Sequence, residues 1–241
     1  MSRILVSRRR ILTGAAAFSG LLLSGCDKTF LPPHRKRGLG GIAEQLNMAS
    51  HRLFMTRRSM APEFGVQDIS RHFPVEGQSY PEDEDYRRLL HGNFADWTLS
   101  VKGLVNRPVR LTLDQIKRLP SRTQITSHSC EKGWTAIAQW TGVQVSRLLQ
   151  LAGGVKPEGR YVVFKAFGGG SSFDLFDAMH AQTILAYGMN GKELPIPHGA
   201  PLRLRMERHV GYSQTKFVSE VEVIDRPGKP GNSGWHWYTG V

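Results

Sequence analysis

The sequence predicts an α+β fold in which mixed β-sheets are combined with short helices. Stretches with strand-like alternation of apolar and polar residues are interspersed with short stretches of helical periodicity, so neither kind of element dominates. No GxGxxG motif follows a predicted strand, and the sequence has no phosphate-loop lysine pattern. Dinucleotide and triphosphate binding are therefore not supported.

The strands are predicted from alternation and from short apolar runs. Residues 97–101 alternate between apolar and polar side chains, the period of a half-buried strand. In a further strand, residues 123, 125 and 127 share one face, and this strand leads to a loop that contains Cys130. Other strands are predicted at residues 161–167, 202–206 and 218–224, with a hairpin signal, Asn190-Gly191, inside residues 185–194.

Two short helices are predicted between these strands. Residues 112–115, with the sequence Thr-Leu-Asp-Gln, have the form of a capping box that opens a helix, and Pro120 ends it. Residues 143–152 carry apolar side chains at helical spacing, and Gly153-Gly154 follows them as a helix stop.

The N-terminus has the three parts of a signal peptide for an exported lipoprotein. Residues 7–12 match the twin-arginine pattern, and residues 11–23 form an apolar stretch too short to span about 30 Å of hydrocarbon. Residues 23–26, Leu-Ser-Gly-Cys, resemble a lipobox, and Asp27 resembles an inner-membrane retention signal. We expect twin-arginine export, lipidation of Cys26 and attachment to the periplasmic side of the inner membrane. The alternative is a basic tail followed by a buried helix.

Three parts of the chain are expected: a signal peptide over residues 1–26, a basic tether over 27–63 and one domain over 64–241. Residues 32–38 of the tether are basic and marked by Pro and Gly, with little to bury. Apolar and aromatic content rises from Phe64 onward, and the remaining length is enough for one domain with a substantial core.

The charge balance of the chain is strongly basic. It carries 32 Lys and Arg against 20 Asp and Glu, a formal net charge of +12, and removing residues 1–26 takes away four arginines and no acidic residue, leaving +8. Such a charge suits nucleic acid, a membrane surface or an anionic cofactor. Export argues against nucleic acid, as does the absence of any stretch in which aromatic and basic residues are interleaved.

Cys130 is the sole thiol once Cys26 is lipidated. A thiol without a cysteine partner in an oxidising compartment is expected to be buried or bonded to something. The surrounding sequence, Ser-Cys-Glu-Lys-Gly-Trp over residues 129–134, suggests a metal ligand. The alternative is a small buried hydrophobic residue.

Several ordered blocks resemble the sulfite-oxidase family of molybdenum-cofactor oxidoreductases. The blocks are Cys-Glu-Lys-Gly-Trp at 130–134, Trp-Thr-Gly-Val at 140–143, Leu-Ala-Tyr and Asn-Gly-Lys-Glu-Leu-Pro within 185–195, His-Gly-Ala-Pro-Leu-Arg at 198–203, and Gly-Tyr with a later Lys within 211–216. Upstream, Ser-Arg-His-Phe-Pro at 70–74 resembles the family's Arg-Asn-His segment. The resemblance covers residues 64–241, and it implies the sulfite-oxidase-type molybdopterin-binding fold.

The resemblance implies a molybdenum-molybdopterin cofactor with Cys130 as the metal ligand and catalytic residue, since thiolate is a soft ligand suited to such a metal. His198, Arg203 and Lys216 fall where the family contacts the pterin phosphate, which cationic groups bind well. Arg71 and His72 would supply further hydrogen-bond donors to the cofactor from the N-terminal segment. The alternative for these side chains is an ordinary solvated or core position, which for Arg203 is a solvent-facing strand arginine.

The sequence departs from the family in places that bear on substrate. Ser70 occupies the first position of the Arg-Asn-His segment, and residues 168–172, Gly-Gly-Gly-Ser-Ser, stand in a loop where sulfite-oxidising relatives have a tyrosine. These departures put sulfite in doubt while leaving cofactor binding intact. The sequence ends soon after the last block, without the dimerisation domain of longer relatives, and we expect a monomer.

We therefore expect a periplasmic oxidoreductase that transfers an oxygen atom to or from a small sulfur- or nitrogen-containing substrate. The sequence has no Cys-x-x-Cys-His haem site, so the redox partner is expected to be a separate cytochrome or membrane haem protein. Two alternatives stay open: a non-catalytic, lipid-anchored binding module that keeps the fold, and a zinc site built on His128 and Cys130.

Overall fold

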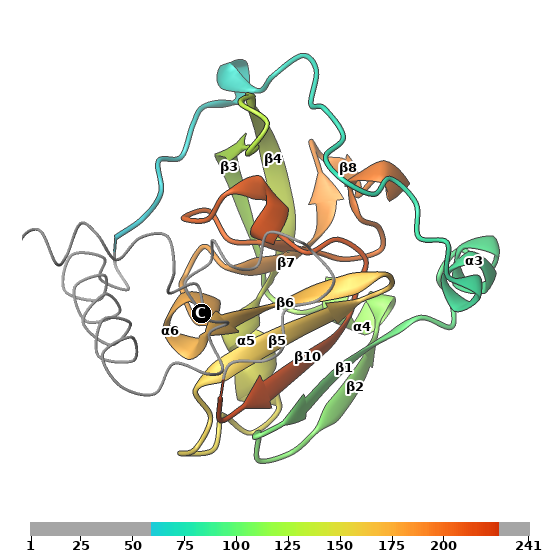
Figure 1. Ribbon diagram of the computed structural model, residues 1–241, viewed down its shortest axis with the longest axis vertical. Coiled ribbons are helices and arrows are strands. Elements are labelled where there is room, and N and C mark those ends of the chain that lie inside the picture. Colours follow the sequence, from blue (N-terminus) through green and yellow to red (C-terminus); the bar gives the residue numbers. More distant parts are fainter. Residues whose placement is uncertain (1–58, 227–241) are drawn as a thin grey trace, which may run out of the picture. The chain divides into compact units, whose positions relative to one another are not determined.

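Most of the predicted strands form, and they are arranged in two sheets that share one apolar core (Figure 1). The structure, a computed structural model, describes residues 59–226. The predicted signal peptide, Cys26 and most of the predicted tether lie outside these residues. No helix between residues 59 and 226 has the length and apolar character needed to cross a bilayer.

The first sheet is mixed. Its strands in spatial order are β2 (Val109–Thr112), β1 (Thr98–Gly103), β10 (Val218–Ile224), β5 (Tyr161–Ala166) and β6 (Gly169–Asp174). β1 and β10 run parallel, whereas the other neighbours are antiparallel. The last strand of the described chain is thus inserted between β1 and β5, which joins the two ends of the domain in one sheet.

The second sheet is antiparallel. Its strands are β3 (Ser121–Ser129), β4 (Thr135–Gln144), β7 (Ile184–Met189) and β8 (Lys192–Glu193), and β9 (Arg203–Arg205) also pairs with β7. Asn190 and Gly191 connect β7 to β8 with φ values of 51° and 74°, the left-handed conformations that a tight hairpin turn requires. This confirms the predicted hairpin.

The helices are short and lie between the strands. The α-helices are α3 (Glu84–His91), α4 (Leu113–Lys117), α5 (Val145–Leu151) and α6 (Leu175–Ala178), and the 3₁₀-helices are η2 (Val66–Asp68), η3 (Ile196–His198) and η4 (Gly211–Ser213). The capping box of α4 is confirmed, because the Gln115 side chain accepts from the Thr112 N–H at 2.8 Å and the Thr112 side chain accepts from the Gln115 N–H at 3.2 Å. The predicted helix over residues 143–152 is α5.

β3 buries a polar face. Gln124, Thr126 and His128 point inward and are almost fully buried, whereas Ile125 on the other face is only half-buried. β9 also buries charge, because Arg203 and Arg205 are both almost fully buried. The alternation of apolar and polar residues therefore predicted these strands correctly, but their polar side chains face the interior. The alternative that Arg203 is a solvent-facing strand residue is therefore wrong.

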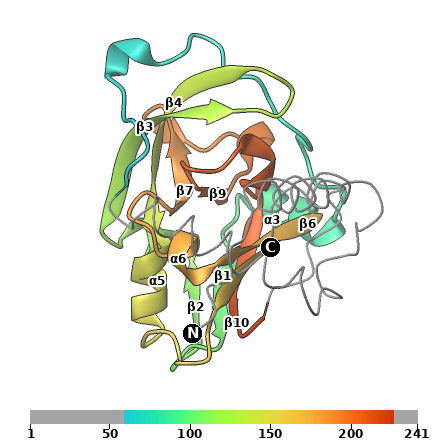
Figure 2. The same ribbon diagram turned by 60° about the vertical axis from the view of Figure 1, so that its left-hand side comes forward.

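A segment that we call the N-terminal strap, residues 59–76, holds the end of the β3–β4 hairpin from both edges. On the β3 edge, the backbone N–H of Phe64 donates to Ile125 at 2.9 Å. On the β4 edge, Ser70 donates to the Ile137 carbonyl at 3.0 Å and accepts from the Ile137 N–H at 2.9 Å. In Figures 1 and 2 the strap passes over the hairpin end, and it then delivers Glu76 to the loop that contains Cys130.

Candidate functional site

Cys130 lies in the turn between β3 and β4, which fixes the position of its sulfur. Its backbone N–H donates to the Trp134 carbonyl at 2.9 Å, and its carbonyl accepts from Gly133 at 3.0 Å. Gly133 has a φ of 89°, a conformation that favours glycine and closes this turn. The Cys130 residue is only 6% exposed.

The Cys130 thiol is surrounded by acceptors and one donor. Its single S–H is shared between Glu76 Oε1 at 3.3 Å and Glu131 Oε2 at 3.5 Å, and its sulfur accepts from the Lys132 N–H at 3.4 Å. Burial, together with the two carboxylates, raises the pKa of the Cys130 thiol to about 11. The thiol is therefore protonated at neutral pH until a metal or another cation displaces the proton.

Glu76 and His128 form the inner wall beside Cys130. Glu76 Oε2 is 2.5 Å from His128 Nε2, and the opposite ring nitrogen, Nδ1, is 2.6 Å from Arg205 Nη1. Both nitrogens of His128 are thus engaged, so this histidine has none left to bind a metal with Cys130. The zinc site postulated on His128 and Cys130 is not formed.

Three basic groups crowd together next to this wall. Arg203 donates to the His198 carbonyl at 2.9 Å, and Lys216 donates to the Pro197 carbonyl at 2.9 Å and to the Glu76 carbonyl. Burial and the neighbouring cations lower the pKa of Arg203 to about 9, that of Lys216 to about 8 and that of His198 to about 4. An anion bound among these groups would reverse those shifts.

Phe73 packs at the centre of the site. Its ring lies 5.4 Å from His128, 5.4 Å from His198, 5.5 Å from Trp140 and 5.9 Å from Trp134, measured between ring centroids. Three of these contacts are edge-on, the geometry that aromatic pairs prefer. Phe73 therefore fastens the strap to the hairpin and to η3 at once.

The other two predicted residues, Arg71 and His72, lie on the strap and are exposed. The charge of His72 lies near enough to His198 to contribute to lowering the His198 pKa. The structure therefore brings Cys130, His198, Arg203, Lys216 and His72 to one region. Arg71 is exposed on the strap. Their roles stay predictions.

The residues present fit the cofactor that the resemblance implies. The Nε of Arg203 is buried and has no hydrogen-bond partner in the described part of the chain, although Arg203 is only 3% exposed. A buried guanidinium donor of this kind needs an acceptor, and a phosphate supplies several. Gly199 lets the chain pack closely against two of the basic residues, because a Cβ there would come within 2.9 Å of the Lys216 side chain and 3.1 Å of the Arg203 side chain.

Residues 168–172 are not a loop beside the site, as the sequence suggested. Most of them belong to β6, where Gly170 pairs with Lys165 and Ser171 pairs with Phe164. The small residues fit there because a Cβ on Gly170 would lie 2.6 Å from the Phe164 carbonyl oxygen. The Ser171 hydroxyl hydrogen-bonds that of Thr215, which precedes Lys216, so this strand still contacts the region of the basic groups.

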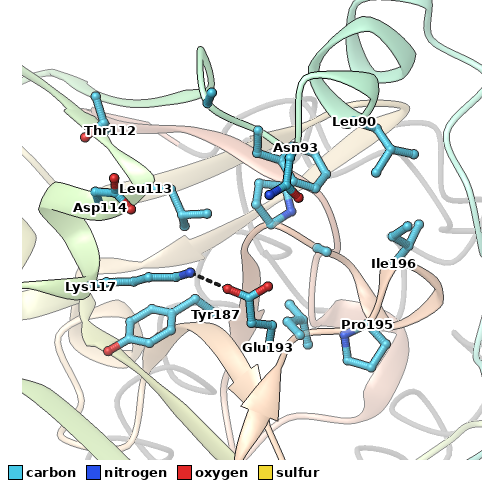
Figure 3. Close-up of a pocket in the computed structure, with 15 residues that line it drawn as sticks. Leu90, Asn93, Thr112, Leu113, Asp114, Lys117, Tyr187, Glu193, Pro195 and Ile196 are labelled. Carbon is cyan, nitrogen blue, oxygen red and sulfur yellow. Dashed lines mark hydrogen bonds and ion pairs between the residues drawn. The ribbon is translucent and has the colours of Figure 1, made fainter.

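A separate hollow of about 710 Å³ lies between α3, α4 and residues 193–201 (Figure 3). Lys117 and Glu193 form an ion pair of 2.7 Å in its wall, beside Tyr187. None of the predicted site residues lines this hollow, although Ile196 and Ala200 belong to the segment that carries His198. The candidate site is therefore identified by its chemistry and not by the volume of a cavity.

Sequence reasoning missed Glu76, Arg205 and Glu207. Arg205 and Glu207 were visible only as the polar positions of an alternating strand, and Glu76 follows the Arg71-His72 block by a few residues without a motif of its own. One signal was available for Arg205, since two arginines at positions i and i+2 point to the same face of a strand. If Arg203 faces the cofactor, Arg205 must lie on the same side.

Comparison with known proteins agrees with this geometry. Residues 88–232 match the family described as oxidoreductase molybdopterin binding domain. Over 98% of this chain and 88% of the relative, the sequence is 32% identical to an Azospira oryzae protein named as the YedZ1 subunit of a protein-methionine-sulfoxide reductase. It is 27% identical to the catalytic subunit MsrP of a protein-methionine-sulfoxide reductase from Gluconobacter oxydans, over 91% of this chain and 70% of the relative.

A solved structure gives the same assignment of fold. The sulfane dehydrogenase SoxCD from Paracoccus pantotrophus superposes with a TM-score of 0.52 and 27% sequence identity. The superposition covers 55% of this chain and 39% of the SoxCD chain. The two proteins therefore share the molybdopterin-binding fold over the common part.

Proposed function

The chain belongs to the family of oxidoreductases with a molybdopterin-binding domain, and from this premise we propose that it reduces methionine sulfoxide. It is a molybdopterin-dependent oxidoreductase of the sulfite-oxidase family. The relatives that match nearly its whole length carry the name of methionine-sulfoxide reductase subunits, which supports the substrate and the direction of the reaction.

The observation that carries the proposed chemistry is that one buried thiol lies near Arg203, Lys216 and His198, and that within residues 59–226 neither Arg203 nor Lys216 forms an ion pair with a carboxylate. When bound, the cofactor supplies oxygen-atom transfer at a molybdenum ion. The chain contributes Cys130 as the thiolate ligand, which must release its proton on binding because its pKa is raised. Arg203, Lys216 and His198 would hold the pterin phosphate, and the unpartnered Nε of Arg203 supports this role.

The rim of the site suits an alkyl sulfoxide. Val75 and Val210 are both exposed, and they flank Glu76 and Gly211 respectively, the residues that meet at the inner wall. These apolar side chains would contact the alkyl stem of a methionine sulfoxide. Reduction of the sulfoxide takes up two electrons and two protons and yields the thioether and water.

The proposed compartment and partners rest on features of the sequence. We propose twin-arginine export, lipidation at Cys26 and residence of the domain, residues 64–241, on the periplasmic side of the inner membrane, tethered by residues 27–63. The electrons would come from a separate membrane haem protein or cytochrome, since no haem attachment site exists in the sequence. The protein is proposed to act as a monomer.

Dye-linked assays on purified protein from a host that makes the cofactor test the substrate. We expect oxidation of a reduced viologen dye with methionine sulfoxide, whether free or in a protein, and loss of this activity in Cys130→Ser. Oxidation of sulfite with ferricyanide, without sulfoxide reduction, would reverse the proposed direction. Stoichiometric molybdenum without either activity would favour the binding module.

A further inference from the structure

A chain of buried polar groups leads from the Cys130 sulfur into the second sheet. Glu76 from the strap contacts Cys130 at 3.3 Å and His128 of β3 at 2.5 Å. His128 contacts Arg205 of β9 at 2.6 Å, and Arg205 forms an ion pair with Glu207 at 2.6 Å. Three segments that are far apart in sequence, namely the strap, β3 with the turn after it, and β9 with the residues after it, are thus connected through one carboxylate beside Cys130.

The direction of these hydrogen bonds follows from Arg205. A guanidinium can only donate, so Nδ1 of His128 must accept from it and carries no proton. The neutral ring then has its proton on Nε2, which donates to Glu76 Oε2. Glu76 is therefore held as an acceptor whose orientation is fixed.

Arg205 is held just as firmly. Its side chain and that of Glu207 are both 0% exposed, and its guanidinium carbon lies 4.3 Å above the Trp140 ring. Glu207 also accepts from Gln124 at 2.7 Å. Burying such an ion pair gives little or no net stability compared with apolar side chains of similar size. Stability alone does not account for this pair.

Gly211 leaves the space in which Glu76 meets His128. A Cβ at this position would lie 2.3 Å from Glu76 Oε2 and 2.5 Å from His128 Nε2. The backbone of η4 therefore closes directly over the hydrogen bond and shields it from solvent, and the Glu76 side chain is only 12% exposed.

We propose that Arg205 and His128 are positioning residues that hold the Glu76 carboxylate beside Cys130, where its negative charge lowers the reduction potential of the bound molybdenum. This proposal rests on molybdenum binding at Cys130, which is part of the proposed function, but not on the substrate. A buried negative charge favours the more oxidised and more positive metal, because little solvent screens it. Groups outside the ligand shell commonly tune metal centres in this way.

Glu131 offers a matched control. Its carboxylate is also close to the sulfur, at 3.5 Å, but the residue is exposed and His128 does not hold it. Replacing Glu76 or Glu131 with Gln exchanges a carboxyl group for an amide of the same size in each case. The reduction potential should shift upward in Glu76→Gln and by clearly less in Glu131→Gln, because solvent screens the second charge.

The measurement is a redox titration of purified protein followed by the electron paramagnetic resonance signal of Mo(V), with molybdenum content measured in parallel. If wild-type protein gives no molybdenum signal, both the proposed function and this proposal fail. If the signal is present and Glu76→Gln leaves the potential unchanged, or shifts it no more than Glu131→Gln, only this proposal is overturned.

A second set of variants tests whether Arg205 acts through Glu76. Arg205→Met combined with Glu207→Leu removes the whole ion pair, so no unpaired charge is left in the core and the fold should persist. This variant should raise the potential and change the Mo(V) spectrum. Adding Glu76→Gln to it should give no further upward shift. Additive shifts, or an unchanged potential in the variant without the ion pair, would overturn the positioning role.

Discussion

Lys216→Gln should lower the retention of the cofactor before it changes the rate of turnover. The Lys216 ammonium donates to two backbone carbonyls that aim it into the site, and burial with the nearby charge of Arg203 lowers its pKa to about 8. At pH 7 it is still mostly charged. Gln can keep one donor toward the carbonyls, so the main loss is the charged contact with the pterin phosphate.

The size of the effect follows from that one contact. A hydrogen bond to a charged group contributes about 1.5–3 kcal/mol, which corresponds to a cofactor affinity weaker by roughly tenfold to a hundredfold. The pH dependence has a defined sign. Free protein loses the Lys216 charge as the pH rises through about 8, so wild-type cofactor retention should weaken above that pH. Lys216→Gln should lack this step.

The assay measures molybdenum per protein after purification and again after prolonged dilution at pH 7 and pH 9. Lys156→Gln is the control, because Lys156 is an exposed residue between α5 and β5 and the change in net charge is the same. Activity is expressed per bound molybdenum. Full molybdenum retention combined with reduced turnover in Lys216→Gln would refute the assignment and place Lys216 against the substrate instead.

Three further predictions concern the ligand, the buried histidine and export. Cys130→Ala should abolish turnover while leaving the thermal melt largely unchanged, and full activity with bound molybdenum would remove Cys130 as the ligand. In folded protein the pKa of His128 is about 2, below the ordinary value of about 6.5 in the unfolded chain, so stability should fall by up to about 1.4 kcal/mol per pH unit as the pH drops below about 6.5. Urea titrations at several pH values should show a shallower fall in His128→Gln, and an equal slope would contradict the neutral ring. Arg8→Lys with Arg9→Lys should keep the precursor in the cytoplasm, whereas Cys26→Ser should be exported and released into the soluble periplasm by a high-salt wash; membrane retention after that wash would argue against the lipid anchor.

Much of the fold could be predicted from local patterns. The capping box at Thr112 and the hairpin at Asn190-Gly191 are determined by residues that are adjacent in sequence, so the sequence alone sufficed for them. The place of β10 between β1 and β5 could not be predicted in this way. It depends on pairing between residues more than a hundred positions apart, such as Ser100 with Glu220, for which no local signal exists.

The site was predicted only in part, because local motifs identify some of its residues and long-range contacts determine the others. Cys130, His198, Arg203 and Lys216 stand in recognisable blocks, and the structure brings them together. Alternation shows that the two faces of a strand differ, but it does not show which face is inside. On β3 the polar face is buried, because Arg205 and Glu207 provide the partners that His128 and Gln124 need.

Glu76 could not be assigned from sequence. Its position depends on the path of the strap, which is set by contacts with Ile137 of β4 and by Lys216, whose ammonium donates to the Glu76 carbonyl. Each of these contacts joins residues separated by more than sixty positions. Only the folded chain shows that this carboxylate lies beside the thiol.

X-ray absorption at the molybdenum edge, combined with elemental analysis, tests the central assignment most directly. Wild-type protein should contain about one molybdenum per chain, and its spectrum should show sulfur neighbours from the pterin and from Cys130. Cys130→Ser protein that retains molybdenum should show one sulfur neighbour fewer. Zinc in place of molybdenum, no metal at all, or an unchanged number of sulfur neighbours in Cys130→Ser would contradict the account.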